Sequence, residues 1–94
     1  MWPPDTSRWP RVLVTGAGGP AAIAVIRALQ AAGVRVAAAD ADPTATGLFL
    51  VPAEHRHVIP LASDPRLTDE VLSACRRSRA TVLLPTVDAE LVPL

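Results

Sequence analysis

A glycine-rich stretch near the beginning of the chain has the composition of a loop that can hold an anion. The run Gly16-Ala17-Gly18-Gly19 directly follows the apolar residues Val12-Leu13-Val14 and directly precedes Pro20, which suits the first position of a helix. A strand that breaks into a glycine turn and then opens a helix is typical of the first βα unit of a doubly wound sheet. Because such a turn brings backbone N–H groups to a helix N-terminus, we predict that Gly16, Ala17, Gly18 and Gly19 line a ligand site.

Asp40 is the second candidate, because it follows the apolar run 34–39 at the end of the next expected strand. Dinucleotide sites place a ribose-binding acid there, about twenty residues beyond the glycines. The glycine pattern is incomplete for such a site, since Ala21 or Ala22 stands where the third glycine belongs, depending on the frame. A tight turn that binds nothing and a solvated Asp40 are the alternative interpretations.

A third group of polar residues, Thr86, Asp88 and Glu90, follows the last apolar run, 81–84. Because the carboxyl ends of parallel strands meet at one edge of a sheet, we expect Thr86 and Asp88 to lie near the glycine loop. Asp88 also has the chemistry of an N-cap for a third helix beginning at Ala89, and acids are favourable in a first helical turn. Asp88 and Glu90 are therefore either a working carboxylate pair or the start of a helix.

Other reactive side chains do not form a recognisable site. His55 and His57 would share one face of a strand, but no third metal ligand accompanies them, and polar edge positions are the simpler interpretation. Cys75 falls on the expected apolar face of a helix, where an inert thiol is the default. We assign no catalytic residue and no metal site to this sequence.

The apolar periodicity predicts an α/β fold in the order β-α-β-β-α-β. Right-handed crossovers give a small Rossmann-like, doubly wound parallel sheet of about four strands in the order 3-2-1-4, with helices on both faces. The core positions of the helices are expected at Ala22, Ile23, Ile26 and Leu29, and at Leu67, Val71, Leu72 and Cys75. The expected strands are 11–15, 34–39, a segment of 56–60 centred on 57–59, and 81–84. The first expected helix spans 20–32 and stops at Gly33, and the second has Ser63 or Asp64 as its N-cap with Pro65 just inside it. The apolar patch at 48–51 is expected to be either a turn of helix or an edge segment.

Length and composition indicate one small domain of 94 residues with formal net charge +0 and no lysine. The absence of a basic excess argues against nucleic-acid or anionic-membrane partners. Residues 1–10 read as a loose, proline-rich tail and not as a signal peptide, and no apolar run reaches the ~20 residues of a membrane span, so we expect a cytoplasmic protein.

The stretch 11–94 resembles the N-terminal domain that precedes the ATP-grasp fold in carbamoyl-phosphate-synthase-like carboxylate ligases. The order and spacing of several short pieces carry the resemblance. These pieces are Val12-Leu13-Val14-Thr15-Gly16-Ala17-Gly18-Gly19-Pro20, Asp40-Ala41-Asp42-Pro43 with Gly47-Leu48, Val58-Ile59-Pro60 with Asp64-Pro65, and Leu84-Pro85-Thr86-Val87-Asp88-Ala89-Glu90-Leu91.

The resemblance implies a substrate-lining domain of an ATP-dependent carboxylate–amine ligase that acts through an acyl phosphate. Gly16, Gly18 and Gly19 would line the acceptor side of the cleft, and Asp88 or Glu90 would orient the substrate or the neighbouring module. ATP and Mg²⁺ are implied only for ATP-grasp modules of a longer parent, so this chain alone is expected to be inactive. The implied partners are those modules and a small-molecule carboxylate, with self-association left open. The alternatives are an NAD(P)-binding domain of an epimerase or reductase, cut before its catalytic residues, and a non-catalytic interaction module.

Overall fold

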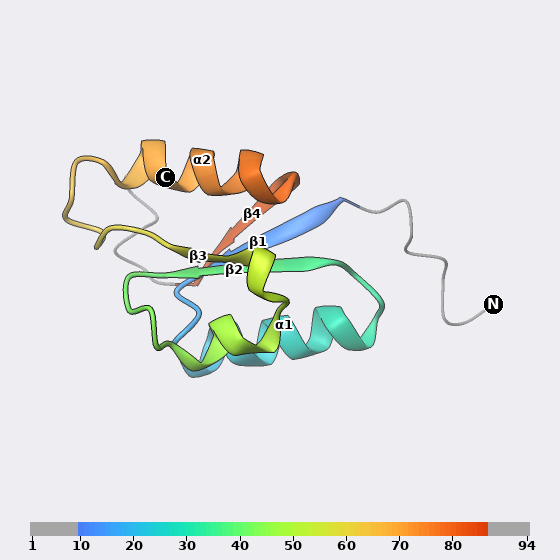
Figure 1. The fold of residues 1–94 in the computed structure, drawn as a ribbon. Coiled ribbons are helices and arrows are strands. Elements are labelled where there is room, and N and C mark those ends of the chain that lie inside the picture. Colours follow the sequence, from blue (N-terminus) through green and yellow to red (C-terminus); the bar gives the residue numbers. More distant parts are fainter. Residues whose placement is uncertain (1–9, 87–94) are drawn as a thin grey trace.

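A computed structural model describes residues 10–86 as a parallel sheet covered by one helix on each face (Figure 1). The strands are β1 (Arg11–Thr15), β2 (Val36–Asp40), β3 (Arg56–Val58) and β4 (Ala80–Pro85), and the α-helices are α1 (Pro20–Ala31) and α2 (Leu67–Ser78). Two 3-10 helices, η1 (Thr46–Leu50) and η2 (Ala53–His55), connect β2 to β3. Within residues 10–86, every helix falls short of the length and apolarity that a membrane span requires.

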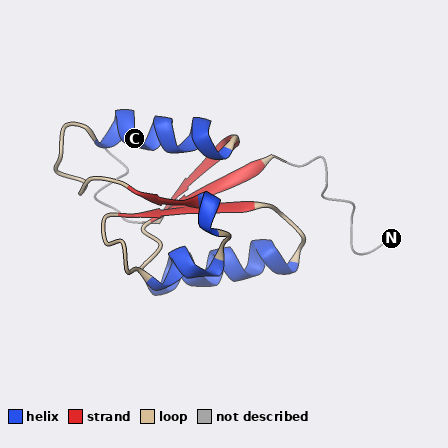
Figure 2. Ribbon diagram, viewed as in Figure 1, coloured by secondary structure: helices blue, strands red, loops and turns tan. Residues whose placement is uncertain are grey.

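The four strands pair in the order β3-β2-β1-β4, all parallel, which confirms the predicted fold class and strand order. The central strand β1 is buried on both faces, with Leu13 and Val14 fully inaccessible. Figure 2 shows α1 and η1 below the sheet and α2 above it. The sheet therefore separates two apolar clusters, as expected for strands whose faces are both covered.

Helix α1 begins at Pro20 as predicted and ends in a glycine cap. Gly33 adopts a left-handed φ of 80°, its N–H donates to the carbonyl of Gln30 at 2.9 Å, and the Val34 N–H donates to Leu29 O at 2.9 Å. This pair of bonds is the Schellman motif, in which the N–H of the residue after the glycine donates to a carbonyl in the last turn of the helix. Because Val34 is used in this way, β2 begins at Val36, two residues later than the sequence predicts.

The beginning of α2 differs from the prediction. The helix begins at Leu67, and its N-cap position is Arg66, which makes no side-chain capping bond. The expected cap by Ser63 or Asp64 is wrong, because Asp64 closes a separate turn before the helix. Its side chain accepts a hydrogen bond from the Arg66 N–H at 2.8 Å, and its carbonyl accepts one from the Leu67 N–H at 3.0 Å.

The buried faces of both helices are partly as predicted. Ala22 and Ile26 are fully buried in α1. In α2 the buried stripe is Leu67, Val71, Ala74 and Ser78, so the prediction of Leu72 as a core residue is wrong; its side chain is 48% exposed. Leu72 lies one position beyond Val71, and a residue one step along a helix turns about 100° away from the core.

The other elements end within about one residue of the predicted positions, and the structure decides between the two interpretations of residues 48–51. Strand β3 ends at Val58 instead of continuing through Ile59, whose N–H still donates to Asp40 O at 3.0 Å. The apolar patch at 48–51 lies largely within the 3-10 helix η1, as one of its two interpretations predicted. The expected third helix from Ala89, and most of the proline-rich tail, lie outside the described residues.

Candidate functional site

The glycine loop closes tightly on itself and leaves few of its N–H groups accessible. Gly16 has a positive φ of 72°, which turns the chain out of β1. The N–H of Ala17 donates to Ala39 O at 3.1 Å, and that of Gly19 donates to Gly16 O at 3.0 Å. The N–H groups of Ala17 and Gly19 are therefore already used in hydrogen bonds within the protein. The first turn of α1, after Pro20, begins with N–H groups that precede any intrahelical acceptor.

Asp40, at the end of β2, fixes the position of this loop. One of its carboxylate oxygens, Oδ2, accepts the Gly18 N–H at 2.7 Å, and Oδ1 accepts the Asp42 N–H at 2.9 Å. A Cβ added at Gly18 would lie 3.1 Å from Oδ2 and 3.3 Å from the Cβ of Ala45, so the lack of a side chain permits this approach. The structure therefore brings the predicted loop and the predicted acid together, in a direct contact between them.

A second glycine, Gly47 in η1, holds the loop from the other side. Its N–H donates to Ala17 O at 2.9 Å, and a Cβ added here would lie 2.1 Å from that oxygen. Sequence reasoning noted Gly47 as part of a family pattern but gave it no structural role. Its contact partner is about thirty residues away in sequence, so no local signal could reveal the close approach.

Thr86 connects the end of β4 to the same place. Its Oγ1 donates to the carbonyl oxygen of Thr15 at 2.7 Å, where β1 enters the glycine loop. The carboxyl ends of β1, β2 and β4 thus converge, as the strand order predicts for a topological switch point. Asp88 and Glu90 lie outside the described residues.

A cavity of about 470 Å³ opens at this convergence. Its polar lining comes from Asp40, Thr86 and the backbone of Gly16 and Gly19, and among the described residues Asp40 supplies its one ionisable side chain. The segment after β3, which the sequence did not single out as part of a site, forms an apolar wall. The lining is completed by Pro20, Ala21, Ala41, Ile59, Pro60, Leu61 and Ala62.

The exposed Leu61 is the most solvent-accessible part of this wall, with 68% of its surface accessible. An apolar side chain at the rim of a cavity is suited to contact with a ligand or another domain. The sequence signal that could have found it is the run Ile59-Pro60-Leu61-Ala62, whose apolar residues continue past the end of a strand.

His55 and His57 do not share one face of a strand, because only His57 lies in β3. His55 is the last residue of η2 and accepts a hydrogen bond at Nε2 from Arg11, whereas His57 lies buried in β3. Within residues 10–86 there is no group of three or more metal-ligating side chains. Cys75 is half-buried in α2, and burial raises the pKa of its thiol.

The fold and the site together define a class of protein: a Rossmann-like α/β domain with a cavity at the switch point of its sheet. The family model for the PylC-like, N-terminal domain matches residues 12–94. The chain belongs to this family and is a pre-ATP-grasp domain of a carboxylate ligase, as the resemblance implied. Such a domain is expected to pair with an ATP-grasp module in a parent ligase. A comparison with curated proteins gives no match.

Proposed function

We propose that the chain lines the substrate cleft of an ATP-dependent carboxylate–amine ligase and has no turnover by itself. The observation that carries this proposal is the cavity at the carboxyl ends of the strands, where the glycine loop, Asp40 and Thr86 meet. In open parallel sheets, ligands bind at this place. The apolar rim at Leu61 is suited to the second wall of a cleft that an adjoining module completes.

The chemistry of the lining supports a substrate role better than a role in holding ATP. A triphosphate needs cations or several free backbone N–H groups, and Mg²⁺ needs oxygen ligands from more than one side chain. Among the described residues that line the cavity, Asp40 has the single ionisable side chain, and its carboxylate would repel phosphate. Nucleotide and Mg²⁺ therefore do not fit this described lining, and we assign them to the ATP-grasp module of the parent.

The same geometry counts against the alternative of an NAD(P) site. Both carboxylate oxygens of Asp40 already accept backbone N–H groups, so a ribose hydroxyl would compete with bonds that hold the loop. The Gly18 and Gly19 N–H groups, which a pyrophosphate would use, donate within the protein. A titration of the chain with NADH should accordingly leave the nicotinamide fluorescence unchanged.

The test is a substitution in the parent ligase with a matched control. Gly18→Val places a branched side chain against Asp40 and Ala45, whereas a Cβ at Gly19 meets nothing nearer than 3.6 Å. We expect Gly18→Val to lower kcat/KM by roughly 10-fold or more, in excess of any loss of folded protein, and Gly19→Ala to retain activity. ADP release with the carboxylate and amine substrates is the assay. Full activity of a folded Gly18→Val ligase would remove the loop from the site.

The absence of turnover in the separate domain needs its own measurement. The chain alone should release no ADP under conditions in which the parent does. ADP release that follows the purified chain through successive columns would contradict the proposal.

A further inference from the structure

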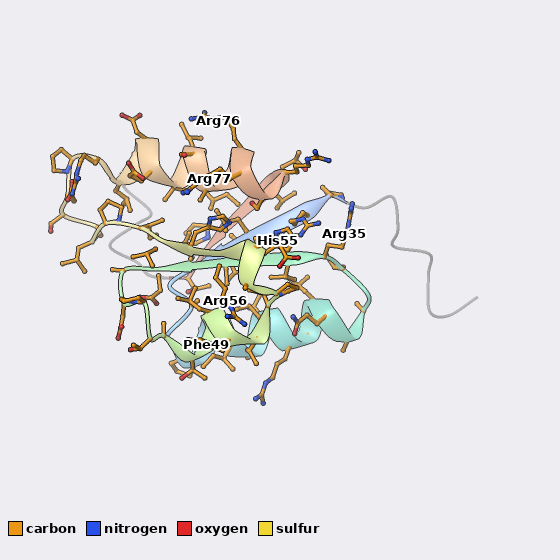
Figure 3. All side chains as sticks on the ribbon, viewed as in Figure 1. Arg35, Phe49, His55, Arg56, Arg76 and Arg77 are labelled. Carbon is orange, nitrogen blue, oxygen red and sulfur yellow. The ribbon has the colours of Figure 1, made fainter. Side chains whose placement is uncertain are left out.

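The end of the sheet opposite the cavity carries a row of basic residues, one at the beginning of each strand. Arg11 is the first residue of β1, Arg35 directly precedes β2, Arg79 directly precedes β4, and His55 directly precedes β3. In the spatial order of the strands the row reads His55, Arg35, Arg11, Arg79. Figure 3 shows Arg35 and His55 at this end of the molecule. Parallel pairing thus aligns cations that are far apart in sequence.

The acidic residues lie mostly at the other end. Asp40 is the last residue of β2, Asp42 follows this strand, and Asp69 and Glu70 lie in the first turn of α2. Among the described residues, only the carboxylate of Glu54 acts on the pKa values of both Arg11 and His55. The part of the chain that the structure describes therefore has an electropositive end and an electronegative end.

A crevice of about 310 Å³ lies within the basic row. Its polar lining consists of Arg11, Arg35, His55 and Gln30, and its apolar lining of Val34, Val36 and Pro52. The residues come from β1, α1, β2, η2 and the loops between them. Gln30 is held in place, because its Nε2 donates to Leu50 O at 2.7 Å. The volume exceeds that of a phosphate or carboxylate group.

Two buried nitrogen atoms in this crevice have no hydrogen-bond partner among the described residues. Arg11 Nη1 contacts His55 Nε2, and since a guanidinium can only donate, Nε2 is the acceptor and the imidazole proton resides on Nδ1. Both Arg11 Nε and His55 Nδ1 are buried, and neither has a partner within the described residues. The crevice therefore contains two buried N–H donors without an acceptor, whereas buried donors in folded proteins ordinarily have a hydrogen-bond acceptor.

The pKa shifts of Arg11 and His55 also favour an anion in this crevice. Burial, followed by the charge of Arg35, lowers the pKa of Arg11. Burial, followed by the charge of Arg11, lowers the pKa of His55. An anion beside Arg11 and His55 would oppose both shifts, because a negative charge favours the protonated form of each side chain.

We propose that this crevice is a binding site for a small oxyanion, a phosphate or carboxylate group, held by Arg11, Arg35 and His55. The guanidinium groups of two arginines present the fork of donors that matches such oxygens. The buried donor atoms of Arg11 and His55 become accessible when these side chains rotate apart, so entry of the anion opens the contact between them. This site is separate from the cavity at Asp40, at the opposite end of the strands.

The experiment is a titration of the complete ¹⁵N-labelled chain with inorganic phosphate and, separately, with acetate, at ionic strength held constant with NaCl. We expect saturable shifts of the Arg11 Nε–Hε signal and of the His55 ring nitrogens, with the Gly18 amide unmoved. Saturation by phosphate alone would identify a phosphate group as the ligand, and equal saturation by acetate would identify a carboxylate group, including one from another polypeptide segment.

Variants decide whether the named residues hold the anion. Arg11→Gln and Arg35→Gln should each weaken binding by at least ~10-fold. Arg27→Gln is the matched control, because it removes the same charge from the exposed surface of α1 and does not line the crevice. The amide spectrum of each variant reports whether it is folded. No saturable shift with either anion, or undiminished binding in the folded Arg35→Gln variant, would overturn the proposal.

Discussion

Replacing Gly47 by alanine is expected to destabilise the domain more than any other single methyl added at the glycines of the site. The new Cβ would lie 2.1 Å from Ala17 O and 2.9 Å from its carbonyl carbon. This is about 1 Å closer than real Cβ contacts allow, and both atoms belong to the backbone, so no side chain can rotate away. The loop and η1 must move apart instead.

The magnitude follows from two contributions. Overpacking of a tight contact costs about 1–3 kcal/mol. Separation of the loop from η1 also breaks the bond from Gly47 N–H to Ala17 O, which is worth about 1 kcal/mol. The free energy of unfolding should therefore fall by about 2–4 kcal/mol, and Tm by roughly 10 °C or more, since a domain of this size loses about 4–8 °C per kcal/mol.

Two other glycines supply graded controls for this measurement. At Gly18 the contacts of 3.1 Å to Asp40 Oδ2 and 3.3 Å to the Ala45 Cβ require shifts of only a few tenths of an ångström, so Gly18→Ala should cost about 1 kcal/mol or less. Gly19 has φ −86°, and the nearest atom to its added Cβ is Gly16 O at an ordinary contact distance of 3.6 Å, so Gly19→Ala should stay within about 0.5 kcal/mol of the natural chain. Urea and thermal unfolding followed by circular dichroism give the three values. A Gly47→Ala variant as stable as Gly19→Ala would refute the packing argument.

Three further outcomes are expected. Asp40→Asn should weaken the hydrogen bond from the Gly18 N–H and lower the free energy of unfolding by about 1 kcal/mol at pH 7, measured in urea. An unchanged urea midpoint would show that the Asp40 carboxylate does not stabilise the loop. Hydrogen bonds from Arg66 lower the pKa of Asp64 in the folded chain. The stabilising contribution of Asp64 is therefore complete above its pKa in the unfolded chain and is lost as the pH falls through its lower folded pKa. In an NMR titration of Arg66→Gln the Asp64 pKa should rise, and an unchanged Asp64 pKa would contradict this. Because burial raises the pKa of the Cys75 thiol, the folded chain should react with iodoacetamide more slowly at pH 8 than the chain in urea, and equal rates would show an accessible thiolate.

The sequence by itself determined the elements and the order of the strands. Apolar runs such as Val12-Leu13-Val14 specify strands buried on both faces, and Pro20 and Gly33 set the ends of α1 through their own backbone preferences. Right-handed crossovers then leave a single strand order for this pattern. These are local or topological constraints, and for that reason they can be read without coordinates. The boundaries at Val36 and Leu67 were missed because hydrogen bonds of neighbouring turns decided them.

The placement of functional groups was decided only by the tertiary structure. The sequence identified the glycine loop and Asp40, but it could not show that they bind each other and thereby close the loop amides. The approach of Gly47 to Ala17, the apolar wall at Leu61 and the alignment of Arg11, Arg35 and His55 all join residues that are distant in the chain. Such contacts depend on the register between parallel strands and on the packing of η1 and η2, which no local pattern of residues encodes.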